Sequence, residues 1–226
     1  TVMTIKLYKL DGSPAVRTVL MAFEALKLNY ETQDVNLMSG EHKTPEYLEK
    51  NPAHTIPMIE EDGFILSDSH AILTYLASKY DSEQQLNLYP SDLKIRATII
   101  QRLFYEATIL NKASTTLVYE ILRHGKSAPA PEHIEGVIGS YEILDRYLQK
   151  TKFVACDNVT IADISCLTSI TTAQFWVPVD EKFTKLKAWL NTLKEEDWYK
   201  KGNLPGLNLY KQYMKTKFNI DSATTE

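Results

Sequence analysis

The chain has 226 residues, 44% hydrophobic and 24% charged, which is the composition of a globular protein with one large or two modest domains. With 8 Gly and 9 Pro it resembles neither collagen nor a low-complexity chain, and a net charge of −4 gives no reason to expect nucleic acid or a membrane as a partner. The sequence contains no apolar run near the roughly 20 residues of a transmembrane helix, and its N-terminus lacks an apolar signal region.

The first 83 residues alternate strand and helix signals. Alternating side chains predict a strand over 5–9, and Ser13-Pro14 then opens a helix with an apolar stripe at helical spacing. A strand over 28–35 and a short helical turn over 44–50 follow. Asp62-Gly63 predicts a hairpin between 57–60 and 64–66, and Ser67 and Asp68 cap the next helix. The order β-α-β-α-β-β-α fits a thioredoxin-like layer of helices on a small mixed sheet.

Residues 81–92 are polar and predict a linker, after which every periodic segment is helical. We therefore expect an α/β thioredoxin-like domain over 1–83 and an all-α bundle over 92–220. Its helices are expected at 92–123, 132–147, 161–173, 183–193 and 204–214. The two cysteines, Cys156 and Cys166, have no metal-ligand spacing and form no CxxC, so the sequence predicts reduced cytoplasmic thiols and no metal site.

The segment Ser13-Pro14-Ala15-Val16-Arg17 stands where the first strand meets the first helix. Unsatisfied N–H groups and the dipole at a helix N-terminus favour an anion, and a thiolate placed there would have a lowered pKa. The competing interpretation, that Ser13 is only an N-cap, is the stronger one from the local sequence alone. A protease-type serine has less support, because no G-x-S-x-G flanks it.

Two further segments have the chemistry of a binding site. In 51–57, Pro57 starts a strand after a loop, an arrangement compatible with a cis peptide that leaves the N–H and C=O of Ile56 free to pair with an extended peptide. In 67–72, Asp68 suits an ammonium group, while Ser69 and the helix N-terminus suit a carboxylate. The alternatives are a rigid loop and a plain helix cap.

Together, Ser-P-x-V-R, N-P-x-H-T-x-P and D-S-H-A-I resemble the glutathione transferase superfamily, and within it the insect-type delta and epsilon classes, epsilon better. The resemblance runs from about residue 3 to 217 and includes the S/T-x-x-D capping box at Thr160 and Asp163, whose role is structural.

The resemblance implies that Ser13 is the catalytic residue, donating a hydrogen bond to the thiolate of glutathione as co-substrate. The implied glutathione-binding residues are His42, His54, Thr55, Ile56, Pro57, Asp68, Ser69, His70 and Glu106. His54 and, more weakly, His42 would reach the glycyl end, and Glu106 would support the base of the site unless it is a solvated helix residue. Related delta proteins carry Arg in place of His70, so we expect a charge partner to be missing there.

The co-substrate pocket is expected from a segment with fewer aromatic residues than epsilon relatives have, so the sequence predicts an unusually polar pocket. Its candidate residues are Leu10, Asn111, Ser114, Thr115, Val118, Tyr119 and Leu207. The resemblance implies a cytoplasmic, homodimeric transferase acting on small, mostly apolar electrophiles. A non-catalytic ligand-binding protein and a glutathione-dependent isomerase or dehydrochlorinase remain alternatives. A thiol–disulfide oxidoreductase is disfavoured, because it needs Cys where Ser13 stands.

Overall fold

The computed structural model describes residues 4–81, 86–125 and 128–218. Its first part has the predicted order of elements: β1 (Ile5–Lys9), α1 (Pro14–Ala25), β2 (Tyr30–Asp34), the 3-10 turn η1 (Glu41–Lys43), α2 (Pro45–Lys50), β3 (Met58–Glu61), β4 (Phe64–Ser67) and α3 (Ser69–Tyr80). The sheet order is β2-β1-β3-β4, with β1 parallel to β2 and antiparallel to β3. The second strand is shorter than predicted, and η1 was not predicted.

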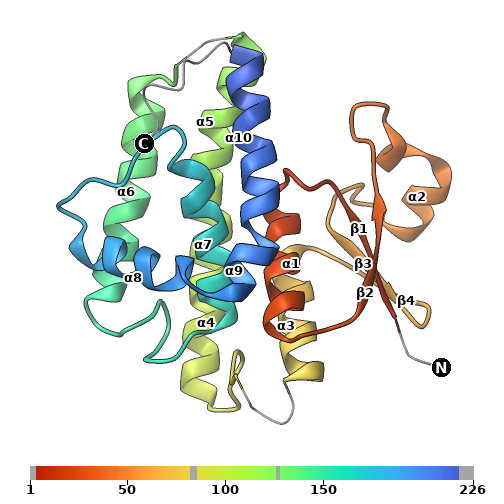
Figure 1. Cartoon of the computed structure of the whole chain (residues 1–226), viewed down its shortest axis with the longest axis horizontal. Helices are drawn as coiled ribbons and strands as arrows, with labels where there is room; N and C mark the ends of the chain where they lie inside the picture. Colours follow the sequence, from red (N-terminus) through yellow and green to blue (C-terminus); the bar gives the residue numbers. More distant parts are fainter. Residues whose placement is uncertain (1–3, 82–85, 126–127, 219–226) are drawn as a thin grey trace.

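Alternating side chains give this sheet two different faces. Ile5 and Leu7 of β1 and Ile59 of β3 belong to the main core with α1 and α3. Tyr8 and Met58 point the other way, into a smaller cluster with residues from α2 and the β2 exit. Figure 1 shows the result, with α1 and α3 between the sheet and the helical bundle and α2 on the far side.

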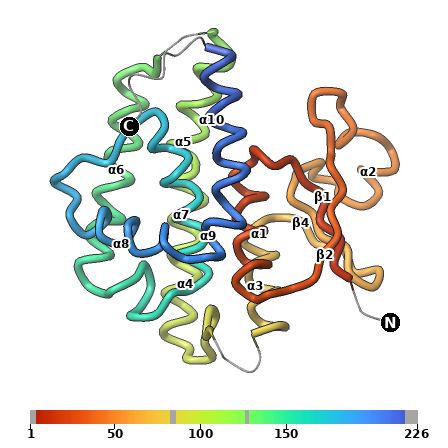
Figure 2. Tube along the Cα trace, viewed as in Figure 1, coloured from red at the N-terminus to blue at the C-terminus, as the bar shows by residue number. Residues whose placement is uncertain are grey.

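The second part is entirely helical in the described residues: α4 (Leu93–Tyr105), the π-helical segment η2 (Glu106–Leu110), α5 (Asn111–His124), α6 (Pro131–Leu148), α7 (Ile161–Ala173), α8 (Thr184–Lys194), α9 (Asp197–Gly202) and α10 (Leu204–Phe218). The helix predicted over 92–123 is confirmed as a continuous helical stretch, but the π-helical segment η2 that divides it into α4 and α5 was not predicted. Helix α9 was not predicted. Figure 2 shows that α7 lies among its neighbours in the bundle, beside α1.

Helix α7 is the centre of the bundle, because all thirteen of its residues are buried. Its predicted capping box is confirmed, since the carboxylate of Asp163 accepts hydrogen bonds from the backbone N–H (2.8 Å) and the hydroxyl (3.0 Å) of Thr160. Within the described ranges, no helix combines the length and the apolar character that crossing a membrane requires.

Candidate active site

Strand register brings the three sequence motifs to one end of the sheet. Tyr8 of β1 pairs with Met58 at the start of β3, and Met58 pairs with Ser67 at the end of β4. The chain leaves β1 toward Ser13, enters β3 from Ile56, and leaves β4 toward Asp68. Segments far apart in the sequence therefore present a hydroxyl, a free backbone edge and a carboxylate at the same place.

Ser13 is the N-cap residue of α1, but its hydroxyl makes no capping hydrogen bond within the described structure. The side chain is partly exposed, and the backbone N–H of Ser13 donates to the carbonyl of Leu10 (2.9 Å). The interpretation of Ser13 as a simple cap therefore loses its main support. The hydroxyl is available to an incoming group at the N-terminus of α1.

The loop before β3 is held by side chains that leave Ile56 uncommitted. The carbonyl of Thr55 accepts hydrogen bonds from the Tyr47 hydroxyl (2.7 Å) and from Nδ2 of Asn51 (2.9 Å). The Ile56–Pro57 peptide bond is cis, as the sequence reading allowed. Neither the N–H nor the C=O of Ile56 has a hydrogen-bond partner among the described residues, so both can pair with an added extended segment.

Asp68 caps α3 with one carboxylate oxygen and leaves the other free. Its Oδ1 accepts hydrogen bonds from the backbone N–H groups of His70 (2.9 Å) and Ala71 (3.1 Å). The backbone of Asp68 has φ +75° and ψ 121°, a conformation that side-chain-bearing residues rarely adopt. The carboxylate is largely exposed, and Ser69 beside it is partly exposed. The first turn of α3 therefore offers a negative charge at Asp68 and, beside it, the hydroxyl and backbone N–H of Ser69, neither of which has a hydrogen-bond partner among the described residues.

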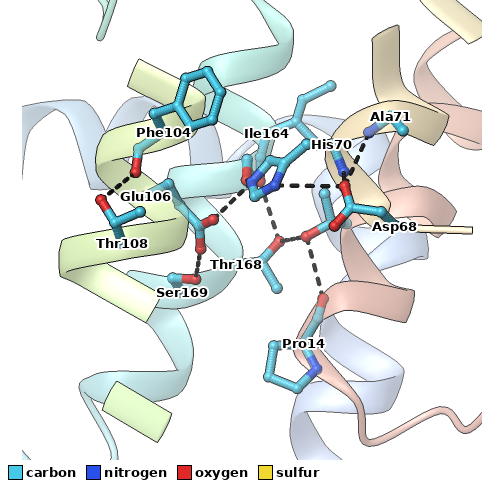
Figure 3. Close-up of polar contacts among 12 residues, drawn as sticks. Pro14, Asp68, His70, Ala71, Phe104, Glu106, Thr108, Ile164, Thr168 and Ser169 are labelled. Carbon is cyan, nitrogen blue, oxygen red and sulfur yellow. Dashed lines mark hydrogen bonds and ion pairs between the residues drawn. The ribbon is translucent and has the colours of Figure 1, made fainter. Parts of the chain in front are cut away.

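His70 has a charge partner, contrary to the sequence-based expectation. Its Nε2 lies 2.7 Å from Oε2 of Glu106 and 2.9 Å from Oγ of Ser165, and Figure 3 shows this contact between α3 and the helical bundle. Burial opposes the positive charge, but the hydrogen bond and the charge of Glu106 outweigh it and raise the pKa of His70. Glu106 is buried, not solvated, and its other oxygen accepts the Ser169 hydroxyl.

A cavity of about 270 Å³ opens beside Pro14, the residue after Ser13. Five of the predicted pocket residues line it: Asn111, Ser114, Thr115, Val118 and Tyr119. Two do not. Leu207 is buried against the aromatic side chains of α10 and its neighbours, and Leu10 is exposed on the β1–α1 loop. The cavity is thus built mainly by α5, facing the start of α1.

The expectation of a polar pocket is wrong, because the hydroxyl groups of Ser114 and Thr115 are bonded to backbone carbonyls of their own helix. Ser114 donates to the carbonyl of Leu110 (3.0 Å), and Thr115 donates to that of Asn111 (2.7 Å). Such bonds to the preceding helical turn satisfy the hydroxyl and leave carbon facing outward. The lining surface is accordingly almost wholly apolar. The Asn111 side-chain amide has no hydrogen-bond partner among the described residues.

Comparisons with known proteins agree over nearly the whole chain. Family models described as the N-terminal and C-terminal domains of glutathione S-transferase match residues 7–84 and 105–197. Glutathione S-transferase 1 of Manduca sexta is 41% identical over 220 residues, 96% of this chain and 100% of that protein. An epsilon-class glutathione S-transferase from the housefly, Musca domestica, superposes with a TM-score of 0.88 at 38% identity, covering 95% of this chain and 98% of the other.

The chain belongs to the glutathione S-transferase family.

Membership makes this protein a transferase with glutathione as co-substrate, and the neighbours place it with the insect delta and epsilon transferases. A glutathione transferase homologue from Drosophila mojavensis, solved with bound glutathione, is 36% identical, with a TM-score of 0.87 over 95% of this chain and 98% of that one. The fold class is confirmed as a thioredoxin-like domain followed by a helical domain.

Sequence reasoning missed half of the cavity lining of this transferase. The missed residues come from α1, the end of α5, α7 and α10: Pro14, Leu122, Ser169, Thr172 and Tyr210. The signal for Leu122 was present, because it lies one helical turn beyond the predicted Val118. Ser169 and Thr172 of α7 had no such signal, because the pattern of this segment predicts a helix buried on all sides and marks no face that borders a cavity.

Proposed function

We propose that Ser13 donates a hydrogen bond to the thiolate of bound glutathione, and that the thiolate attacks a small apolar electrophile in the cavity beside Pro14. The observation that carries this proposal is the uncommitted Ser13 hydroxyl at the N-terminus of α1, at the end of the sheet where Ile56 and Asp68 also lie. A helix N-terminus and a hydroxyl donor both favour the anionic form of a sulfur.

The remaining groups of glutathione match the groups that the fold gathers there. The backbone of Ile56 pairs with the cysteinyl residue as an added strand, and the free oxygen of Asp68 receives the γ-glutamyl ammonium. The hydroxyl and backbone N–H of Ser69, at the N-terminus of α3, receive the γ-glutamyl carboxylate. The rings of His42 and His54 lie 6.1 Å apart by their centroids, and two imidazoles placed together suit the glycyl carboxylate.

We propose that Glu106 supports the base of the glutathione site, as the resemblance implies, and that it does so through His70. Both carboxylate oxygens of Glu106 are engaged, one by His70 and the other by Ser169. The pair therefore fixes the first turn of α3, with Asp68 and Ser69, against the helical domain, and Glu106 itself does not touch the tripeptide.

The chemistry of the cavity selects the electrophile. Its hydroxyl-bearing residues offer carbon surface, so a compact apolar molecule fits, and Asn111 supplies one uncommitted amide for a carbonyl or nitro oxygen. The sulfur forms a bond to the electrophilic carbon, and either a leaving group departs or the adduct takes a proton. Turnover separates this function from ligand sequestration, and the product distinguishes conjugation from isomerisation or dehydrochlorination.

The test is Ser13→Ala, with Thr44→Ala as the matched control that removes a hydroxyl from the N-terminus of α2. A hydrogen bond to charged sulfur is worth about 1.5–3 kcal/mol, so Ser13→Ala should raise the pKa of bound glutathione by about one to two units. Thiolate absorbance titrated against pH reads this directly, and conjugation at neutral pH should fall in parallel. An unchanged titration in Ser13→Ala would refute the role of Ser13.

We further propose that two copies of the chain associate. Ile100 and Phe104 lie one turn apart on α4 and are 41% and 65% exposed, and Phe64 on the edge strand β4 is 46% exposed. Ile100 and Phe104 share one face of α4, and apolar side chains that gather into an exposed patch mark interaction sites. Light scattering at micromolar concentration should give twice the chain mass, and Phe104→Asp should shift it toward the monomer; a monomeric wild-type protein would contradict the proposal.

We propose a cytoplasmic location, supported by the two free thiols Cys156 and Cys166. Burial raises the pKa of the Cys166 thiol, which keeps that side chain unreactive. Fractionation of the native tissue tests the location, and recovery of the protein in a membrane or secreted fraction would contradict it.

The division into domains at 1–83 and 92–220 stays a prediction as to its boundaries.

A further inference from the structure

Arg17 is a buried cation with no carboxylate partner among the described residues. The side chain is wholly buried, and its guanidinium donates only to neutral groups, Oδ1 of Asn203 (2.5 Å) and Oγ1 of Thr172 (2.6 Å). Its Nε has no hydrogen-bond partner in the part of the chain that the structure describes. Burial lowers the pKa of Arg17 to about 10, so the group still carries its charge at neutral pH. An isolated buried charge is costly unless something compensates it.

The position of Arg17 places this charge behind the active site. Arg17 stands one helical turn after Ser13 on α1, and a helical side chain leans toward the N-terminus of its own helix. The stem of Arg17 packs closely against Gly206 of α10, because a Cβ at position 206 would lie 2.7 Å from Cδ and 2.9 Å from Cγ of Arg17. The same Cβ would also meet the carbonyl of Asp11, which belongs to the loop that leads to Ser13. Thr172, one of its partners, lines the co-substrate cavity.

We propose that Arg17 supplies a fixed positive potential beneath Ser13, which favours the thiolate of bound glutathione over the thiol. Arg17 does not touch the sulfur and acts through its charge alone. The guanidinium of Arg17 has only neutral partners among the described residues, and the thiolate of bound glutathione would supply the missing negative charge. The inference rests on the proposed role of Ser13, and it adds a second source of thiolate stabilisation that the hydroxyl cannot replace.

The other ionisable groups near Arg17 do not cancel this potential. Tyr199 of α9 and Tyr210 of α10 are neutral at physiological pH, because burial raises the pKa of both hydroxyls. Lys211 of α10 adds positive charge, and its pKa is lowered by burial and by neighbouring cations that include Arg17. The carboxylate of Asp11 is engaged by Lys9 at 2.6 Å. Because the guanidinium of Arg17 is wholly buried, its field is screened less than that of a surface cation.

The experiment compares Arg17→Met, which keeps the stem and removes the charge, with Arg17→Lys, which keeps the charge and loses the forked hydrogen bonds. Asn203→Ala is the control for the structural role, since it removes a partner of the guanidinium but no charge. The readouts are the pH titration of thiolate absorbance with glutathione bound, the KM for glutathione, and the melting temperature.

We expect Arg17→Met to raise the pKa of bound glutathione by about one unit, with kcat at neutral pH reduced about tenfold and KM for glutathione changed much less. Arg17→Lys and Asn203→Ala should melt at lower temperature, yet leave the thiol titration close to the wild-type position. A folded Arg17→Met with the wild-type titration overturns the inference.

If Arg17→Met does not fold, Arg17→Lys decides. A thiol pKa returned to the free value of about 8.5 in that folded variant, despite its retained charge, would overturn the inference and leave Arg17 as a tie between α1 and the helical domain. Absence of any bound thiolate signal in the wild-type protein would instead refute the proposed glutathione site as a whole.

Discussion

Asp163→Ala is expected to destabilise the protein severely without altering its chemistry. The Asp163 carboxylate is completely buried and accepts four hydrogen bonds, from the N–H (2.8 Å) and the hydroxyl (3.0 Å) of Thr160, the N–H of Val154 (2.9 Å) and Nε1 of Trp189 (2.9 Å). The carboxylate thus joins the start of α7 to the loop before it and to α8. Alanine would leave three N–H donors unpaired where water does not reach.

The magnitude follows from those unpaired groups. Each buried, unsatisfied donor costs about 1–3 kcal/mol. Burial raises the pKa of Asp163, so removing the carboxylate also relieves a desolvation cost, and the net loss should be about 3–5 kcal/mol. For a chain of 226 residues, each kcal/mol lowers the melting temperature by about 2–4 °C, which predicts a loss on the order of 10 °C.

The matched control is Asp92→Ala at the exposed start of α4. Asp92 also caps a helix, accepting hydrogen bonds from the backbone N–H groups of Lys94 (2.9 Å) and Ile95 (2.9 Å), but water can replace it. Its loss should cost about 1 kcal/mol. Thermal melting and urea titration of both variants test the difference, with conjugation per folded molecule measured at low temperature. If Asp163→Ala loses no more stability than Asp92→Ala, the reasoning from burial is refuted.

Three more outcomes follow from local geometry. Because Glu106 raises the pKa of His70, the stability that this pair contributes is complete below about pH 6.5 and is lost as the pH rises through the pKa of His70 in the folded protein. The difference in urea midpoint between the wild type and His70→Asn should therefore shrink over that pH interval. A difference that stays constant with pH would contradict the reasoning. Asp68→Asn keeps the capping oxygen of the side chain but removes its charge, so the KM for glutathione should rise about tenfold or more while the melting temperature stays the same. An unchanged KM would exclude Asp68 from glutathione binding. Gly202→Ala should destabilise the fold, since the new Cβ would lie 2.6 Å from the backbone of α1. Gly136→Ala has open space around the new Cβ and should stabilise the fold by about 0.5–1 kcal/mol. Calorimetry that shows the same sign of change for both variants would refute this.

Local signals in the sequence predicted most of the fold. The alternation of β1, the Asp62-Gly63 turn and the Thr160–Asp163 capping box each depend on neighbours a few residues away, and each is confirmed. The turn has φ +50° at Asp62 and +82° at Gly63, the backbone form that such a pair favours in a hairpin. These features are readable because the interactions that produce them lie within one or two turns of chain.

Helix boundaries were less readable where no local signal marks them. Through Glu106–Leu110 the apolar spacing continues without Gly or Pro, so nothing in the sequence separates α4 from α5. The structure places Glu106 at the start of that segment, where its carboxylate meets His70 from α3 and Ser169 from α7. A contact between residues 36 and 63 positions apart leaves no mark in a local pattern.

The sequence by itself determined most of the order of elements, the caps at Asp68 and Thr160, and the residue types available for glutathione, because these follow from short-range sterics and hydrogen bonding. Only the tertiary structure decided what those residues face. It placed the hydroxyls of Ser114 and Thr115 on backbone carbonyls of the preceding turn, so that a polar segment lines an apolar cavity. It also enclosed Arg17 among neutral partners from α7 and the α9–α10 junction. The burial of a side chain and its long-range pairing depend on which surfaces come into contact when the two domains pack. A short segment of sequence does not contain that information.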